Sequence, residues 1–226
     1  MNLFPPAVER DGTCCFSFLK SKDMKKGADI YSYSKKIRRT RSLATLKDGD
    51  SMLGAEMTFY EGHLYLPWDA DFRILGKDTL RGQDCLVVEA IPAIFSDFYL
   101  KRWVTWVETE NFTDLHTEYF DRKGMLFKVA DKEWKKLQGS GHWVTSLWDY
   151  YNFKNKNRSF LQFDNWLIDS GLKESSFDPV RMTEEKIWRK ISNPPPVLKE
   201  LSDFPPNPEV RQEFWQSINA EIRITK

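Results

Sequence analysis

The chain has 226 residues, with 34 Lys and Arg against 33 Asp and Glu, so its formal net charge is +1. This balance excludes a strongly basic nucleic-acid-binding protein and an acidic disordered tail as descriptions of the whole chain. Aromatic residues make up 15% of the sequence, with 9 Trp and 16 Phe. Because each large ring buries much area, the sequence predicts one domain with either a sizeable core or an open apolar cavity.

The sequence has no membrane-spanning or metal-binding pattern. No run approaches the roughly 20 apolar residues that cross a bilayer, and the opening MNLFPPAVERDG lacks the pattern of a secretory signal. Three cysteines and three histidines without a CxxC pair give no zinc motif. We therefore expect no metal, no cofactor, no bound nucleic acid and no membrane-spanning segment.

Strand-like alternation runs from residue 13 to about residue 163. The first predicted strands lie at 14–19 and 28–42, and Tyr31 and Tyr33 share one face of the second. One apolar and one polar face at a period of two residues is typical of half-buried antiparallel strands.

Two further strands are predicted at 83–92 and 101–110. Leu86 and Val88 share a face of the first, and Trp103 belongs to an apolar face of the second. These two strands continue the antiparallel pattern.

A hairpin follows, with predicted strands at 115–120 and 125–130. Its turn is Asp121-Arg-Lys-Gly124, in which Gly124 supplies the positive φ. Strict alternation gives its two strands one apolar face, formed by Leu115, Tyr119, Met125, Phe127 and Val129.

Short strands joined by tight turns, with no βαβ alternation and no nucleotide-binding motif, predict a meander that curls into a barrel or half-barrel. After Phe177 the pattern changes, and helices are predicted at 183–191 and from Asn207 to about Ala220, separated by a Pro-Pro-Pro run. We expect residues 183–226 to pack back on the sheet. The alternative is a detached arm that binds a partner.

Candidate catalytic groups are few. Asp69 and Asp71 could flank a sugar as acid and nucleophile or base, but they follow a Pro-Trp pair and are also typical loop residues. The imidazoles are those of His63, His116 and His142, and no GxSxG motif accompanies them. His116 is expected to be exposed on a polar face. We therefore expect no enzyme activity.

A basic cluster occupies residues 35–41. The guanidinium groups of Arg38, Arg39 and Arg41 could bind a phosphate or a lipid headgroup. They could equally form a solvated strand end that pairs with nearby carboxylates. The sequence alone leaves both interpretations open.

The apolar face of the predicted sheet is the remaining signal. It can be a closed core under helices or a lipid cavity, because both use the same residue types. The candidate lining residues are Tyr31, Tyr33, Leu86, Val88, Trp103, Leu115, Tyr119, Met125, Phe127 and Val129.

Five stretches, in order, resemble one protein family. They are DIYSYSKKIRRTRS, DSMLGAEMTFYEGH, RILGKDTLRGQDCLVVEAIP, YLKRWVTWVETENFTDLHTEYFDRKGMLFKVAD and NRSFLQFDNWLIDSGLKESSFDPVRM. The chain resembles the bacterial outer-membrane lipoprotein-sorting-like proteins of LolA/LolB-like fold over roughly residues 14–182. The family's proline before the Arg pair is absent, and Ser34 and Lys35 stand there instead.

This resemblance implies a mainly β (α+β) fold: a strongly curved antiparallel sheet that forms an incomplete β-barrel, with helices covering its concave face. It implies a domain over residues 1–182 that lacks its N-terminal part, followed by the extension at 183–226. The implied function is that of a non-enzymatic, monomeric carrier of lipid or lipoprotein acyl chains in the periplasm, serving a membrane lipid exporter. The arginines at 38, 39 and 41 would then contact a headgroup or a partner.

A different class of function also fits the residues. The sheet could close over a plain core and act as a structural or protein-interaction module. Such a module would dock its partner through residues 183–226.

Overall fold

The fold is known from a computed structural model, which describes residues 2–4, 13–19, 28–34, 38–42, 49–52, 54–62, 70–93, 98–163, 166, 168 and 178. Within these residues every regular element is a β-strand. The chain divides into two compact units, one containing β1 to β4 and the other β5 to β11. No helix in this part of the chain is long and apolar enough to cross a membrane.

The first unit contains an antiparallel four-stranded sheet in the order β1-β2-β3-β4. Its strands are β1 (Asn2–Phe4), β2 (Thr13–Leu19), β3 (Ala28–Ser34) and β4 (Arg39–Ser42). The segment expected at 28–42 is therefore two strands, and Arg38, just before β4, has a left-handed φ of 48°.

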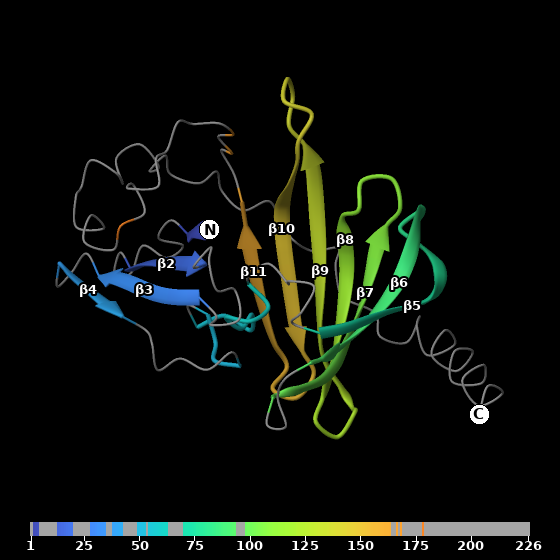
Figure 1. The fold of residues 1–226 in the computed structure, drawn as a ribbon, viewed down its shortest axis with the longest axis horizontal. Helices are drawn as coiled ribbons and strands as arrows, with labels where there is room; N and C mark the ends of the chain where they lie inside the picture. Colours follow the sequence, from blue (N-terminus) through green and yellow to red (C-terminus); the bar gives the residue numbers. More distant parts are fainter. Residues whose placement is uncertain are drawn as a thin grey trace. The chain divides into compact units, whose positions relative to one another are not determined.

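The second unit contains an antiparallel seven-stranded sheet in the order β11-β10-β9-β8-β7-β6-β5 (Figure 1). Each strand pairs with its neighbours in the chain, and the edge strands β5 and β11 do not pair with each other, so the sheet is open. The strands are β5 (Ala70–Leu80), β6 (Gln83–Pro92), β7 (Leu100–Glu108), β8 (Asp114–Asp121), β9 (Leu126–Lys136), β10 (Trp143–Asn152) and β11 (Asn157–Gln162).

The predicted mainly β class is confirmed, although the chain forms two sheets rather than one meander. The strand predicted at 83–92 is β6, with the same bounds, and the hairpin predicted at 115–130 is β8–β9. Gly124 in its turn has a φ of 79°, as expected. No helix is found among the described residues, so the covering helices are not confirmed, and the helices predicted after residue 182 lie outside the described part.

The register divides the side chains of the seven-stranded sheet between two faces. On one, Trp103 of β7 lies opposite Tyr119 of β8, and we call this the Trp103 face. On the other, His116 of β8 lies opposite Trp106 of β7 and Asp131 of β9, and we call this the His116 face.

The His116 face carries an apolar cluster. Its buried members are Cys85, Val87, Val104, Trp106, Leu115 and Phe120. The tip of the β5–β6 hairpin bends over this cluster, because Arg81 in the tip reaches Asp131 on β9, 2.6 Å away, across the two intervening strands β7 and β8. Trp106 also donates its indole N–H to Asp78 near the same tip, at 2.7 Å. The sheet is therefore strongly bent at this end.

The Trp103 face is covered at one end by a turn-rich segment rather than by a helix. We call residues 49–52 and 54–62 the cover segment. Met52 and Met57 are buried in it and joined by a 2.8 Å backbone hydrogen bond. The Tyr60 ring packs edge-on against Trp103, with 5.7 Å between the ring centroids.

Candidate functional site

Five residues form a continuous row across the Trp103 face, which we call the paired row. Each lies directly opposite the next on the neighbouring strand: Phe72, Ala90, Trp103, Tyr119 and Lys128. Neighbouring strands are about 4.8 Å apart, so the row is about 19 Å long. Phe72 and Trp103 are in edge-on ring contact, with 6.2 Å between centroids.

A β-bulge places Lys128 in this row. Phe120 pairs with Leu126 and Tyr119 pairs with Lys128, so Phe127 is an extra residue on β9. Beyond a bulge, side chains of the bulged strand change faces. Val129 therefore lies on the His116 face opposite Glu118, and not beside Tyr119 as strict alternation predicted.

Lys128 is buried in an ion pair with Glu61 of the cover segment. Its Nζ lies 2.6 Å from Oε1 and 2.7 Å from Oε2 of Glu61, and both side chains are at most 2% exposed. Tyr99 donates its hydroxyl to Oε1 at 2.9 Å, and the Thr58 N–H donates to Oε2 at 3.1 Å. Three donor groups thus converge on one carboxylate.

Aromatic rings surround this ion pair. The Lys128 Nζ lies 5.2 Å from the ring centroid of Tyr119 and 5.9 Å from that of Tyr150. Burial, together with the negative charge of Glu61, raises the pKa of Tyr150 well above its ordinary value, so its phenol is neutral. The buried cation is therefore held by one carboxylate and by the negative faces of rings.

Glu56 is a second anchor of the cover segment. Its carboxylate accepts hydrogen bonds from Asn152 at 2.8 Å and Asn155 at 2.9 Å, and its backbone N–H donates to the Ser159 hydroxyl at 3.0 Å. Burial raises the pKa of Glu56, but these asparagine hydrogen bonds outweigh burial and lower it overall. The cover segment is thus held by the carboxylates of Glu56 and Glu61.

The other end of the paired row is open and apolar. Phe72 is 46% exposed, and Ile74, on the same face of the edge strand β5, is 64% exposed. Ile74 lies opposite the half-buried Val88, and Leu86 is the next residue on that face of β6. The two ends of the paired row therefore differ: one end has the buried ammonium group of Lys128, and the other has the exposed apolar side chains of Phe72 and Ile74.

The predicted lining residues do not all meet on this face. Four of them lie on the Trp103 face: Trp103, Tyr119, Leu86 and Val88. Leu115 joins the apolar cluster of the other face. Phe127 is the extra residue of the bulge, and Val129 lies on the His116 face. Met125 is 64% exposed next to the turn.

Tyr31 and Tyr33 are in the first unit, on β3. They pair with Ser42 and Thr40 of β4. Their part in a lipid cavity stays a prediction.

The three arginines predicted to contact a headgroup or partner are also in the first unit. Arg39 and Arg41 lie on the edge strand β4, Arg38 directly precedes it, and all three are exposed.

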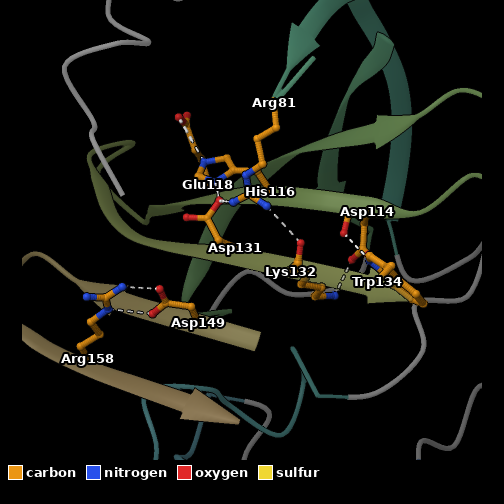
Figure 2. Close-up of polar contacts among 9 residues, drawn as sticks. All are labelled: Arg81, Asp114, His116, Glu118, Asp131, Lys132, Trp134, Asp149 and Arg158. Atoms are coloured by element: carbon orange, nitrogen blue, oxygen red, sulfur yellow. Dashed lines mark hydrogen bonds and ion pairs between the residues drawn. The ribbon is translucent and has the colours of Figure 1, made fainter. Parts of the chain in front are cut away.

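The prediction that His116 is exposed is wrong: it is buried within a polar network on the His116 face (Figure 2). Its Nδ1 lies 2.8 Å from Asp131, which also accepts the hydrogen bond from Arg81. Its buried Nε2 has no hydrogen-bond partner and lies 3.8 Å from Glu118. Asp131 fixes the ring orientation, and burial separates the imidazole from solvent.

Two further ion pairs on neighbouring strands are drawn in the same view (Figure 2). Arg158 holds the buried Asp149 through two hydrogen bonds, at 2.9 and 2.6 Å. Burial raises the pKa of Asp149, while Arg158 lowers it, and the net effect is an increase. Lys132 pairs with Asp114, whose carbonyl accepts the Trp134 indole N–H at 2.9 Å. These contacts join β8 to β9 and β10 to β11.

The remaining polar candidates do not form a site in the described part of the chain. Asp71 is exposed on β5, His142 is exposed between β9 and β10, and His63 and Asp69 lie outside the described residues. No group of three or more His, Cys, Asp or Glu among the described residues could hold a metal ion.

Comparisons with known proteins agree on the fold. A protein-family model described as an uncharacterized protein matches residues 8–184. A domain described as an outer membrane lipoprotein-sorting protein domain from Vibrio parahaemolyticus aligns with a TM-score of 0.66 and 19% identity, over 80% of this chain and 74% of its own. A DUF1329 family protein from Desulfovibrio piger aligns with a TM-score of 0.63 and 18% identity, over 77% of this chain and 72% of its own.

Two further findings complete the comparison. A LolA superfamily protein from Nitrosomonas europaea aligns with a TM-score of 0.49 and 17% identity, over 67% of this chain and 66% of its own. No curated protein sequence matches the chain significantly. The chain belongs to the family of uncharacterized proteins matched over residues 8–184, and the resemblance to outer-membrane lipoprotein-sorting proteins seen in its sequence is confirmed at the level of the fold.

Proposed function

We propose that this protein is a non-enzymatic carrier that binds lipid or lipoprotein acyl chains along the Trp103 face. The observation that carries the proposal is the exposed apolar patch at the open end of the paired row, where Phe72 and Ile74 face solvent on an edge strand. Exposed apolar patches of this kind mark interaction or ligand-binding sites. Each methylene that an acyl chain buries there contributes about 0.8 kcal/mol.

A carrier must also release its cargo, and the cover segment suits this requirement. It is attached to the sheet mainly by polar contacts, through Glu56 and Glu61, and its buried Met52 and Met57 can adapt to different shapes. The Glu56 contacts to Asn152 and Asn155 are part-buried or exposed, so water can replace them during opening at little net cost. The fold of the lipoprotein-sorting domain supports the same class of function.

The rest of the proposal concerns where the carrier acts and what it contacts. We propose that it acts in the periplasm as a monomer and that it receives or delivers cargo at a membrane lipid exporter. The exposed Arg38, Arg39 and Arg41 are the proposed contacts to a headgroup or partner. Residues 183–226 are proposed to pack on the sheet as a helical extension.

The test is a titration of the full chain with a fluorescent long-chain probe, together with native mass spectrometry for co-purified lipid. Ile74→Asp should weaken probe binding about tenfold or more, because a charge on the patch opposes entry of an alkyl chain. The matched control is Ile91→Asp on the neighbouring strand β6, where Ile91 is 43% exposed but pairs with Asp71 on the other face. Absence of both probe binding and co-purified lipid would contradict the proposal.

A further inference from the structure

We propose that the carboxylate of Glu61 occupies a binding site for the carboxylate of a long-chain fatty acid. This inference rests on the proposed function and names both the ligand class and the group that recognises it. In the bound state the ligand's carboxylate takes the place of Glu61, and its alkyl chain follows the paired row toward Phe72.

The site is built for one carboxylate. Lys128 contacts both oxygens of Glu61, at 2.6 and 2.7 Å, while Tyr99 and the Thr58 N–H each donate to a different oxygen. Thr58 also contacts the Tyr99 hydroxyl through its own hydroxyl, at 2.8 Å, which orients that donor. Two of these donors, Lys128 and Tyr99, belong to the sheet unit outside the cover segment, so they remain when the cover opens.

Charge decides which headgroup fits. Lys128 is buried among aromatic rings, and a buried cation without a partner is strongly unfavourable. When Glu61 leaves with the cover segment, a ligand carboxylate can restore the pair, whereas a neutral alcohol cannot. The site therefore selects a monoanionic headgroup over a neutral one of the same length.

The paired row supplies the path for the alkyl chain. Beyond Lys128 it presents Tyr119 and Trp103, which Tyr60 of the cover segment now contacts, and then Ala90 and the exposed Phe72. From the ammonium group to the apolar end the row is about 19 Å long, which suits an extended alkyl chain. The cation and the exposed patch are thus the two ends of one continuous surface.

The experiment compares laurate with 1-dodecanol, which have equal chain lengths and differ in headgroup charge. Each is titrated against the full chain, with displacement of a fluorescent probe as the readout. We expect laurate to bind about tenfold more tightly than dodecanol. Glu61→Gln, which removes the competing charge but keeps the side-chain volume, should tighten laurate binding and leave dodecanol nearly unchanged.

Two variants test the donors. Lys128→Met should remove the preference for laurate, and Tyr99→Phe, which leaves the Lys128–Glu61 pair intact, should reduce it by several fold. Circular dichroism and thermal unfolding show whether each variant is folded, and Tyr99→Phe serves as the test if Lys128→Met does not fold.

The two proposals fail in different ways. If laurate and dodecanol bind equally, and if neither Glu61→Gln nor Tyr99→Phe changes their ratio, the ion pair is only structural and the carboxylate site is refuted, while lipid binding stands. If neither compound displaces the probe, the carrier function itself is refuted.

Discussion

Lys128 lies directly opposite Tyr119 in the β8–β9 pair because Phe127 is an extra residue in β9. Without this bulge Phe127 would pair with Tyr119, and the paired row would end in an aromatic ring instead of an ammonium group. The single inserted residue instead introduces a buried cation, which Glu61 neutralises from 67 positions earlier in the chain. The cover segment can therefore dock through Glu61 only because the bulge sets the register of the β8–β9 hairpin.

Removing the Lys128 ammonium should cost much stability. Lys128→Met leaves the buried carboxylate of Glu61 without its cation, and we expect the free energy of unfolding to fall by about 3–5 kcal/mol. Urea unfolding measures this. The control is Lys154→Met, whose exposed pair with Asp121 should contribute less than about 1 kcal/mol. Equal losses in the two variants would contradict the buried-pair account.

Glu56 should make anchoring of the cover segment dependent on pH. Because the folded-state pKa of Glu56 is lowered, its stabilisation is present above its unfolded pKa and is lost as pH falls through the folded value. Glu56→Gln should therefore cost roughly 0.5–1.5 kcal/mol at pH 7. Urea unfolding should show this difference shrinking as pH falls below about 4. The control is Glu110→Gln at an exposed position, which should change the free energy of unfolding little at pH 7 or at pH 4. If Glu56→Gln lowers the free energy of unfolding equally at both pH values, the proposed role of the Glu56 carboxylate is refuted.

Asp149 should show the opposite pH dependence. Its folded-state pKa is raised by burial, so its favourable contribution is complete below the unfolded pKa and decreases as pH rises through the folded value. Arg158→Met removes the compensating cation and should cost about 2 kcal/mol at pH 7, with a smaller loss at pH 4. The double variant Arg158→Met with Asp149→Asn should lose this pH dependence. A single-variant loss that grows on acidification would contradict the assignment.

The β8–β9 turn should require glycine at position 124. Its φ of 79° lies in the left-handed region, so Gly124→Ala should destabilise the protein by about 1–2 kcal/mol in thermal or urea unfolding. A suitable control is Gly76→Ala on β5, where an added Cβ would meet no atom within 4 Å and the φ is ordinary. Gly76→Ala should be neutral or slightly stabilising. Equal destabilisation by both substitutions would refute the role of the turn.

Local patterns in the sequence predicted the strands that have clear alternation and a turn residue. β6 and the Gly124 hairpin were predictable because apolar residues recur at a period of two and because positive φ favours glycine. The strand β5 was not predicted, because the Asp residues that follow Pro67 and Trp68 are typical of a loop. In the structure Asp71 instead pairs with Ile91 within a long strand.

The candidate site could be predicted only in part. Trp103 and Tyr119 were expected on one apolar face, and they do lie there. The bulge at Phe127 leaves no sign in the alternation of β9, so strict alternation put Phe127 and Val129 on the face of Tyr119, where the structure has Lys128. The role of Glu61 could not be predicted either, because its partner Lys128 is 67 positions away in the sequence.

The exposure of His116 was mispredicted for a related reason. A histidine between apolar neighbours on a half-buried strand is typically solvent-facing. Here the β5–β6 tip bends over that face, and Arg81 reaches Asp131 from 50 positions earlier in the chain. Local alternation shows that a strand has two faces, but not that both are covered.

The polar anchors of the cover segment have a consequence for folding. The backbone N–H of Glu56 bonds to Ser159, 103 positions later, so this contact of the cover segment can form only after β11 has been synthesised. Contacts between residues so far apart form late, because closing a long loop costs entropy before the contact repays it. We therefore expect this contact to form late in the folding of the unit. A ligand that displaced the cover segment, as proposed above, would have to break the same late contact.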